Sequence, residues 1–98
     1  MYADGVLYVT FYATDLAQLH RIAEVYPRHR AHVDDFARGG QIWMIGNFGD
    51  PVGEGAMCIF RSLEGAEQFL ASDPFVLEGI VAASSVREWE PLVYEGSS

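Results

Sequence analysis

The stretch YPRHRAHVDDF, residues 26–36, determines how the middle of the chain can fold. Proline is tolerated in the first turn of a helix, so Pro27 predicts that a helix begins here. His29, Val33 and Phe36 then follow the spacing i, i+4, i+7, which places them on one helical face. A face with valine and phenylalanine normally packs into a core. The histidine on that face therefore needs a polar partner or has a function.

Seven segments of the sequence have the pattern of regular secondary structure. Strands are indicated by β-branched and aromatic runs, and helices by apolar residues at helical spacing. Pro27 separates two helical pieces, because proline inside a helix clashes with the carbonyl four residues earlier. Asp73-Pro74 ends a later helix, since the residue before proline disfavours the helical conformation. The predicted elements are a strand over 6–12, helices over 15–25 and 27–38, a strand over 41–48, a turn-rich loop over 49–55, a strand over 56–60, a helix over 63–72, a strand over 84–94 and a frayed tail over 95–98.

This order of elements is the ferredoxin-like pattern β-α-β-β-α-β, with the two helical pieces taken together. It predicts an α+β fold in which two helices cover one face of an antiparallel four-stranded sheet. Neither side of the strand at 6–12 is clearly polar, so the other face of the sheet is also apolar. Two such sheets packed face to face would bury that surface, and we therefore expect a homodimer, with higher association left open. Residues 1–98 are expected to form a single domain.

The composition excludes several classes of function. The formal net charge is −8, from 14 acidic and 6 basic side chains, so phosphate backbones are repelled and nucleic acid is not expected as a partner. Every basic side chain is arginine, which removes lysine Schiff-base chemistry. Cys58 is the single cysteine, so no intramolecular disulfide or cysteine-based zinc cluster can form. No apolar run is long enough to span a membrane and no signal peptide opens the sequence, so we expect a cytoplasmic protein without a membrane partner.

The ferredoxin-like topology is expected to bring His29 close to Asp73. Its two main helices lie antiparallel and side by side, so the start of the first lies near the end of the second. His29 is at that start and Asp73 is at that end. A carboxylate beside an imidazole fixes its tautomer and favours its protonated form, which makes the pair a candidate general acid/base. The alternative is that the pair only holds two helix ends together.

Aromatic residues and a second histidine provide further candidates. A pocket that holds a small organic ligand is typically apolar, with few polar groups. His29 and His32 have the spacing of a helical metal-ligand pair, with Asp73 available as a third ligand, but no motif such as H-E-x-x-H accompanies them. We therefore expect no metal and no cofactor. The residues predicted to shape a substrate pocket, each of which can equally belong to the core or to a dimer interface, are Tyr12, Trp43, Phe48 and Phe75.

Four segments match the pattern of a known family in its order and over nearly the whole chain: LYVTFYATD, YPRHRAHVDDFARGGQIWMIG, FRSLEGAEQFLASDPFVLEG and SSVREWEP. With its Pro-x-His, its later glycine and its Asp-Pro-aromatic run, the sequence resembles the YciI-like (YCII) domain family. His29 falls on the histidine of the family and Asp73 on its aspartate. Family members often have arginine three positions before the histidine, where this chain has Tyr26.

The resemblance implies a ferredoxin-like fold, dimerisation through the sheet and an active site centred on His29 and Asp73. The best-defined activity in the family is dehydrochlorination of a chlorinated hydroxyhydroquinone. The related dimeric α/β-barrel superfamily includes muconolactone isomerases and quinone-forming monooxygenases. The first hypothesis is therefore a cofactor-independent lyase or isomerase that acts on a small cyclic oxygenated substrate, such as a chlorinated aromatic or a lactone. The alternatives are a non-catalytic dimer that binds a metabolite or a partner protein, and a cofactor-free monooxygenase.

Overall fold

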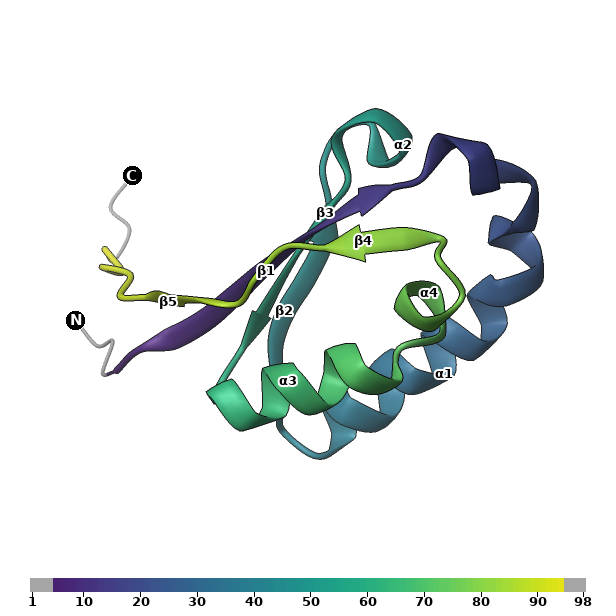
Figure 1. Cartoon of the computed structure of the whole chain (residues 1–98). Helices are drawn as coiled ribbons and strands as arrows, with labels where there is room; N and C mark the ends of the chain where they lie inside the picture. Colours follow the sequence, from purple (N-terminus) through teal and green to yellow (C-terminus); the bar gives the residue numbers. More distant parts are fainter. Residues whose placement is uncertain (1–4, 95–98) are drawn as a thin grey trace.

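The computed structural model describes residues 5–94 and has the predicted ferredoxin-like architecture (Figure 1). The strands are β1 (Leu7–Thr14), β2 (Ile42–Asn47), β3 (Ala56–Phe60), β4 (Val81–Ala83) and β5 (Arg87–Trp89). The helices are the 3-10 helix η1 (Leu16–Arg21) and the α-helices α1 (Ile22–Arg38), α2 (Pro51–Glu54), α3 (Leu63–Ser72) and α4 (Pro74–Leu77). The sheet order is β2-β3-β1-β4, and β5 also pairs with β1. All of these pairings are antiparallel.

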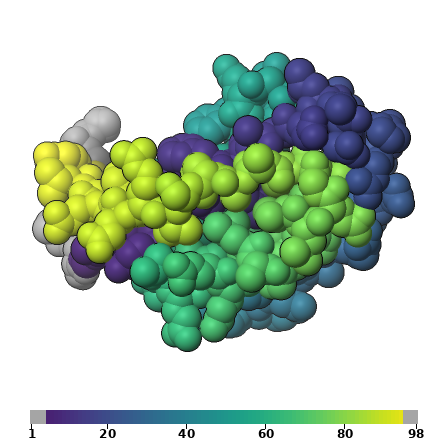
Figure 2. Space-filling model, in the orientation of Figure 1, coloured from purple at the N-terminus to yellow at the C-terminus, as the bar shows by residue number. Residues whose placement is uncertain are grey.

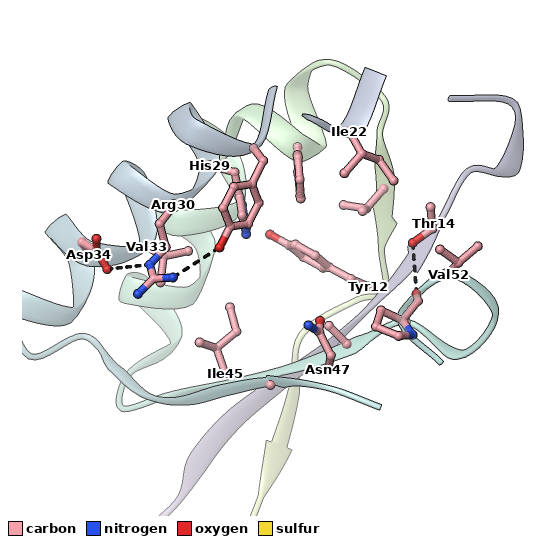
Figure 3. Close-up of a pocket in the computed structure, with 17 residues that line it drawn as sticks. Tyr12, Thr14, Ile22, His29, Arg30, Val33, Asp34, Ile45, Asn47 and Val52 are labelled. Carbon is pink, nitrogen blue, oxygen red and sulfur yellow. Dashed lines mark hydrogen bonds and ion pairs between the residues drawn. The ribbon is translucent and has the colours of Figure 1, made fainter. Parts of the chain in front are cut away.

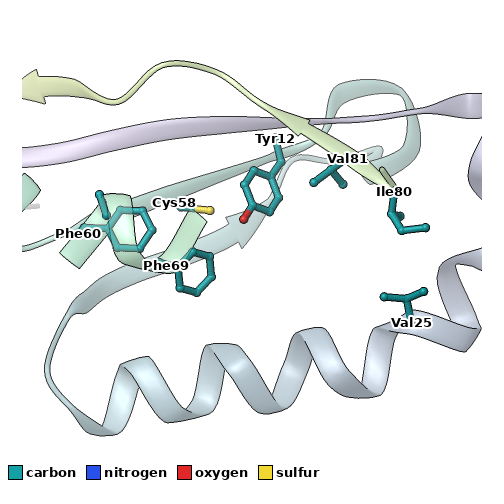
Figure 4. Close-up of a cluster of buried hydrophobic side chains, with 8 residues drawn as sticks. Tyr12, Val25, Cys58, Phe60, Phe69, Ile80 and Val81 are labelled. Atoms are coloured by element: carbon teal, nitrogen blue, oxygen red, sulfur yellow. The ribbon is translucent and has the colours of Figure 1, made fainter. Parts of the chain in front are cut away.

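The helices α1, α3 and α4 lie on one side of the sheet (Figure 1). Side chains alternate between the two faces of a strand, so Tyr8, Thr10 and Tyr12 of β1 point toward the helices. Cys58 and Phe60 lie opposite Thr10 and Tyr8 on β3 and share that face. The core between sheet and helices, shown in Figure 4, consists of Tyr12, Val25, Cys58, Phe60, Ala66, Phe69, Ile80 and Val81.

The helix that carries His29 begins earlier than the sequence predicts. The predicted break at Pro27 is wrong, because α1 runs from Ile22 to Arg38 with Pro27 inside it. Proline removes one backbone donor, while each helical hydrogen bond spans four residues, so the bonds on either side keep the helix continuous. The break comes instead at the junction with η1, which begins after Asp15. Asp15 is the N-cap of η1, and its side chain accepts a hydrogen bond from Ala17 N.

The last predicted strand, over 84–94, is also wrong in its bounds. The chain instead forms two short strands, β4 before this range and β5 within it, so the sheet has five strands and not four. Ser84 separates them: its Oγ accepts a hydrogen bond from the backbone N–H of Phe11 at 2.9 Å. The buried Thr10 donates to the carbonyl of Ser84 at 2.7 Å. The hydroxyl of Ser84 thus accepts the backbone hydrogen bond that a carbonyl of a paired strand would otherwise accept. Figure 2 shows this C-terminal segment, in light green and yellow, crossing the visible face of the molecule.

Two other predictions on the second half of the chain have clear outcomes. The helix over 63–72 is confirmed, and Ser62 caps it by accepting a hydrogen bond from Gly65 N. The loop over 49–55 contains one helical turn, α2. The tail over 95–98 lies outside the described residues. In the part of the chain that the structure describes, no helix has both the length and the apolar character needed to cross a membrane.

Candidate active site

Asp73 is the fixed centre of the candidate site. It lies between α3 and α4, and its backbone is extended because Pro74 disfavours helix at the preceding residue. Its side chain caps α4, with Oδ1 accepting a hydrogen bond from Phe75 N at 3.0 Å. The side chain is fully buried. The local Asp-Pro-Phe sequence therefore holds this carboxylate at the start of α4.

Two side chains from other elements meet the Asp73 carboxylate. His29 of α1 places Nδ1 2.8 Å from Oδ1, so the contact predicted from the topology is confirmed. Tyr12 of β1 donates its hydroxyl to Oδ2 at 2.5 Å. The second contact was not predicted, since the sequence indicated only that Tyr12 shapes a pocket. Strand alternation places Tyr12 on the side of β1 that faces the helices, and this was the one indication of the contact in the sequence. Alternation does not specify which atom the hydroxyl reaches.

The ring of His29 is held in one orientation. It stacks on Phe75 with centroids 4.1 Å apart and an interplanar angle of 8°. The ring of Tyr26 lies 6.0 Å away from it, centroid to centroid. Within residues 5–94, Nε2 of His29 has no hydrogen-bond partner and is not sealed from solvent. With Nδ1 on the carboxylate, Nε2 is the nitrogen available to exchange a proton with a ligand.

A cavity of about 510 Å³ lies beside His29. Figure 3 shows Tyr12 pointing into it from β1, and Ile45 and Asn47 bordering it from β2. Its walls are largely apolar, with contributions from Ile22, Val33, Ile45, Val52, Ala56 and Val81. A mostly apolar space of this size with a few polar groups suits a small organic ring.

Two of the four predicted pocket residues line the cavity and two do not. Tyr12 and Phe75 line the cavity, whereas Trp43 and Phe48 do not. Phe48 stacks on Phe11, with centroids 6.4 Å apart, and Phe11 faces away from the helices. Trp43 lies at an irregularity where the pairing register of β2 shifts. Such a bulge changes which side chains face the core, and a period-two pattern does not predict it.

The surroundings of Asp73 favour its ionised form and keep Tyr12 neutral. Burial alone would raise the pKa of this carboxyl, but hydrogen bonds from His29 and Tyr12, the charge of His29 and the N–H of Phe75 outweigh it. The pKa of Asp73 therefore lies below its ordinary value, and the group is a carboxylate at neutral pH. Burial, followed by the hydrogen bond to Asp73 and its charge, raises the pKa of Tyr12, which stays a neutral donor.

Cys58 lies in the core near this carboxylate and is not a nucleophile at neutral pH. Burial, with a smaller effect of the Asp73 charge, raises the pKa of Cys58 to about 12. The thiolate, and not the thiol, is the reactive form of cysteine. Cys58 is therefore a buried thiol of the core.

His32 is directed into the core and not toward a metal site. Its Nε2 lies 3.0 Å from the carbonyl oxygen of Phe69, which can only accept, so Nε2 carries the proton. The ring packs against Phe36 and Phe69. Among the described residues, no three His, Cys, Asp or Glu side chains are grouped closely enough to hold a metal ion.

The family model of the YCII-related domain matches residues 6–90 of the chain. A solved structure with a similar fold is 5-chloro-2-hydroxyhydroquinone dehydrochlorinase (TftG) from Burkholderia phenoliruptrix AC1100, in complex with 2,5-dihydroxybenzoquinone. It is 22% identical, has a TM-score of 0.67, and the match covers 85% of this chain and 92% of that chain. No curated protein matches the sequence. At this identity, the likeness shows the fold.

Proposed function

The chain belongs to the YCII-related domain family, and we propose that it is a cofactor-independent lyase or isomerase for a small cyclic oxygenated substrate. One observation carries this proposal: His29, which is hydrogen-bonded to the buried Asp73, lines a cavity large enough for one ring. A buried carboxylate that holds an imidazole beside a cavity is a recurrent arrangement for general acid/base chemistry.

In the proposed reaction, Nε2 of His29 takes a proton from a carbon or hydroxyl of the ring. The electron pair left behind forms a new double bond. In a lyase reaction, a leaving group such as chloride departs with its own bonding pair. In an isomerase reaction, the same proton returns to a different atom. Asp73 stabilises the protonated imidazole meanwhile, and Tyr12 fixes the carboxylate through Oδ2.

The comparison with TftG supports the class of substrate. That protein is a dehydrochlorinase of a chlorinated hydroxyhydroquinone, and its structure holds a dihydroxybenzoquinone. Both molecules are small oxygenated rings. We therefore take chlorinated and hydroxylated six-membered rings, together with small lactones, as the first substrates to examine.

We test this function with His29→Gln, which removes the acid/base group and keeps a polar side chain. Turnover of the substrate panel is followed by chloride release and by ultraviolet absorbance. We expect the rate to fall about 10²- to 10⁴-fold, the usual contribution of a general acid/base. His20→Gln is the matched control, because His20 is an exposed histidine of η1. Full turnover by His29→Gln would refute the proposed function.

A homodimer is part of the same proposal. The sheet face opposite the helices, here termed the open face, carries Leu7, Val9 and Phe11 of β1 with Met57 and Ile59 of β3. Val9 and Ile59 are already buried within the single chain, and the residues around them are more exposed. Exposed large hydrophobic side chains lie on or beside it, including Phe11 at 38%, Met44 at 54% and Trp89 at 40% exposure. A contiguous apolar face of this kind is typical of an interface. A second copy of the chain supplies a face of the same shape and character.

A further inference from the structure

The cavity beside His29 contains one arginine. Arg30 follows His29 on α1, and its side chain lies at the cavity in Figure 3. All six basic residues of the chain are arginines, and of the described residues that line the cavity only Arg30 is one of them. In a chain with a net charge of −8, a guanidinium that is always protonated is thus present where a ligand would bind. Its ion-pair partner Asp34 lines the same cavity.

The guanidinium of Arg30 is oriented by two contacts along its own helix. Nε donates to Oδ1 of Asp34 at 3.1 Å, and Nη1 donates to the hydroxyl of Tyr26 at 3.2 Å. Both partners are four residues away, so they lie on the same side of the helix. Arginine has five N–H donors, and these contacts use two. Within residues 5–94 the other three, on Nη1 and Nη2, have no partner.

We propose that Arg30 binds an ionised oxygen substituent of the substrate ring, while His29 exchanges a proton with the same molecule. This inference rests on the proposed function and specifies its substrate class as an anionic ring. Asp34 occupies Nε and Tyr26 one donor of Nη1, which leaves the other Nη1 donor and both Nη2 donors for the ligand. Charge-assisted hydrogen bonds from that edge would also stabilise negative charge that develops on the ring oxygen when a proton is removed.

The test compares two probes that differ in charge. In 2,5-dihydroxybenzoquinone each hydroxyl is conjugated to a carbonyl, so the molecule is acidic and is an anion at neutral pH. Its dimethyl ether, 2,5-dimethoxybenzoquinone, keeps the ring and has no ionisable group. The dissociation constant of each probe is measured by titration calorimetry with the wild type, Arg30→Gln and Arg38→Gln. Arg38 is the matched control, since it pairs with Asp35 on the same helix and does not line the cavity.

We expect the wild type and Arg38→Gln to bind the anion about 10-fold more tightly than the ether, the size of one charge-assisted hydrogen bond. Arg30→Gln should bind both probes equally, with the affinity for the ether unchanged. An unchanged preference for the anion in Arg30→Gln would overturn the inference. If Arg30→Gln keeps the preference for the anion but turnover still depends on His29, the proposed function stands and the role of Arg30 does not. A wild type that binds neither probe would overturn the inference and this substrate class together.

Discussion

At the scale of single residues, Asp73 connects three parts of the chain through one buried carboxylate. Its oxygens accept hydrogen bonds from His29, from Tyr12 and from the backbone of Phe75. These hydrogen bonds hold the pKa of Asp73 below its ordinary value, although burial alone acts in the opposite direction. The ionised form therefore stabilises the folded chain as well as the candidate site.

Asp73→Asn is expected to remove a pH-dependent part of the free energy of unfolding. An unfolded aspartate has a pKa of about 3.9, and the stabilising contribution of Asp73 is fully present well above that pH. It is lost as the pH falls through the lower pKa of the folded state. Urea unfolding from neutral to strongly acidic pH should therefore show a steeper loss of stability in the wild type than in the variant. The difference between the two proteins should be largest at neutral pH, at about 2 kcal/mol.

Asp35→Asn is the matched control for this measurement. Asp35 is a carboxylate with 68% of its side chain exposed, and it pairs with Arg38 on the same helix. Removal of such a surface pair changes stability by less than about 1 kcal/mol. If Asp73→Asn and Asp35→Asn show the same dependence on pH, the assigned charge state of Asp73 is wrong.

The sequence predicts the meeting of His29 and Asp73 because two regular features determine it. Helical spacing turns His29 to the core, and the antiparallel helix pair brings the two helix ends together. The hydrogen bond of Tyr12 and the positions of Trp43 and Phe48 depend on side-chain reach and on a shift of strand register. Neither of these properties is encoded in residue spacing.

At the scale of elements, Gly55 allows the segment with α2 to lie against β1. It precedes β3 with a positive φ of 81°, a conformation that side chains with Cβ rarely adopt. A Cβ atom at this position would overlap the carbonyl oxygen of Tyr12. The backbone next to the hydrogen-bonded tyrosine is therefore packed directly against this glycine.

Gly55→Ala is expected to destabilise the protein by more than about 2 kcal/mol, through backbone strain and the overlap with β1. Gly46→Ala is the matched control, because nothing lies within 4 Å of a Cβ there and its φ is not positive. Urea unfolding at neutral pH measures both variants. Equal effects of the two substitutions would contradict the close approach of Gly55 to Tyr12.

The bounds of two elements could not be read from the sequence for a physical reason. Pro27 marks the loss of one hydrogen bond, but the neighbouring bonds and the packing of α1 decide whether the helix continues. Packing similarly decides where the last strands lie: β4 ends just before Ser84, whose side chain replaces a backbone acceptor, and β5 begins only at Arg87. Local pattern indicates where an interruption is possible, and tertiary contacts decide whether it occurs.

At the scale of the whole molecule, the order of strands and helices was predictable because few topologies accommodate this pattern. The helix layer covers one face of the sheet (Figure 1). The open face carries apolar side chains. The homodimer stays a prediction, since it depends on contacts with a second chain.

We expect the wild type to be a dimer in solution, and Phe11→Glu to be a monomer. A charge at the centre of the open face would be buried without a partner, which opposes association. Size-exclusion chromatography with light scattering measures the mass of each protein. Leu77→Glu is the control, because Leu77 is 64% exposed on α4, in the helix layer. A monomeric wild type would contradict the dimer, and so would a Phe11→Glu variant that still dimerises.

The central claim is that Asp73 holds His29 with its proton on Nδ1, so that Nε2 faces the cavity as the base. Long-range ¹H–¹⁵N correlation spectra of the neutral imidazole measure the tautomer directly, with His29 assigned by comparison with His29→Gln. We predict the Nδ1–H tautomer in the wild type and a loss of this preference in Asp73→Asn. A wild type with the proton on Nε2 would contradict the account, because that nitrogen would then have no lone pair to accept a proton.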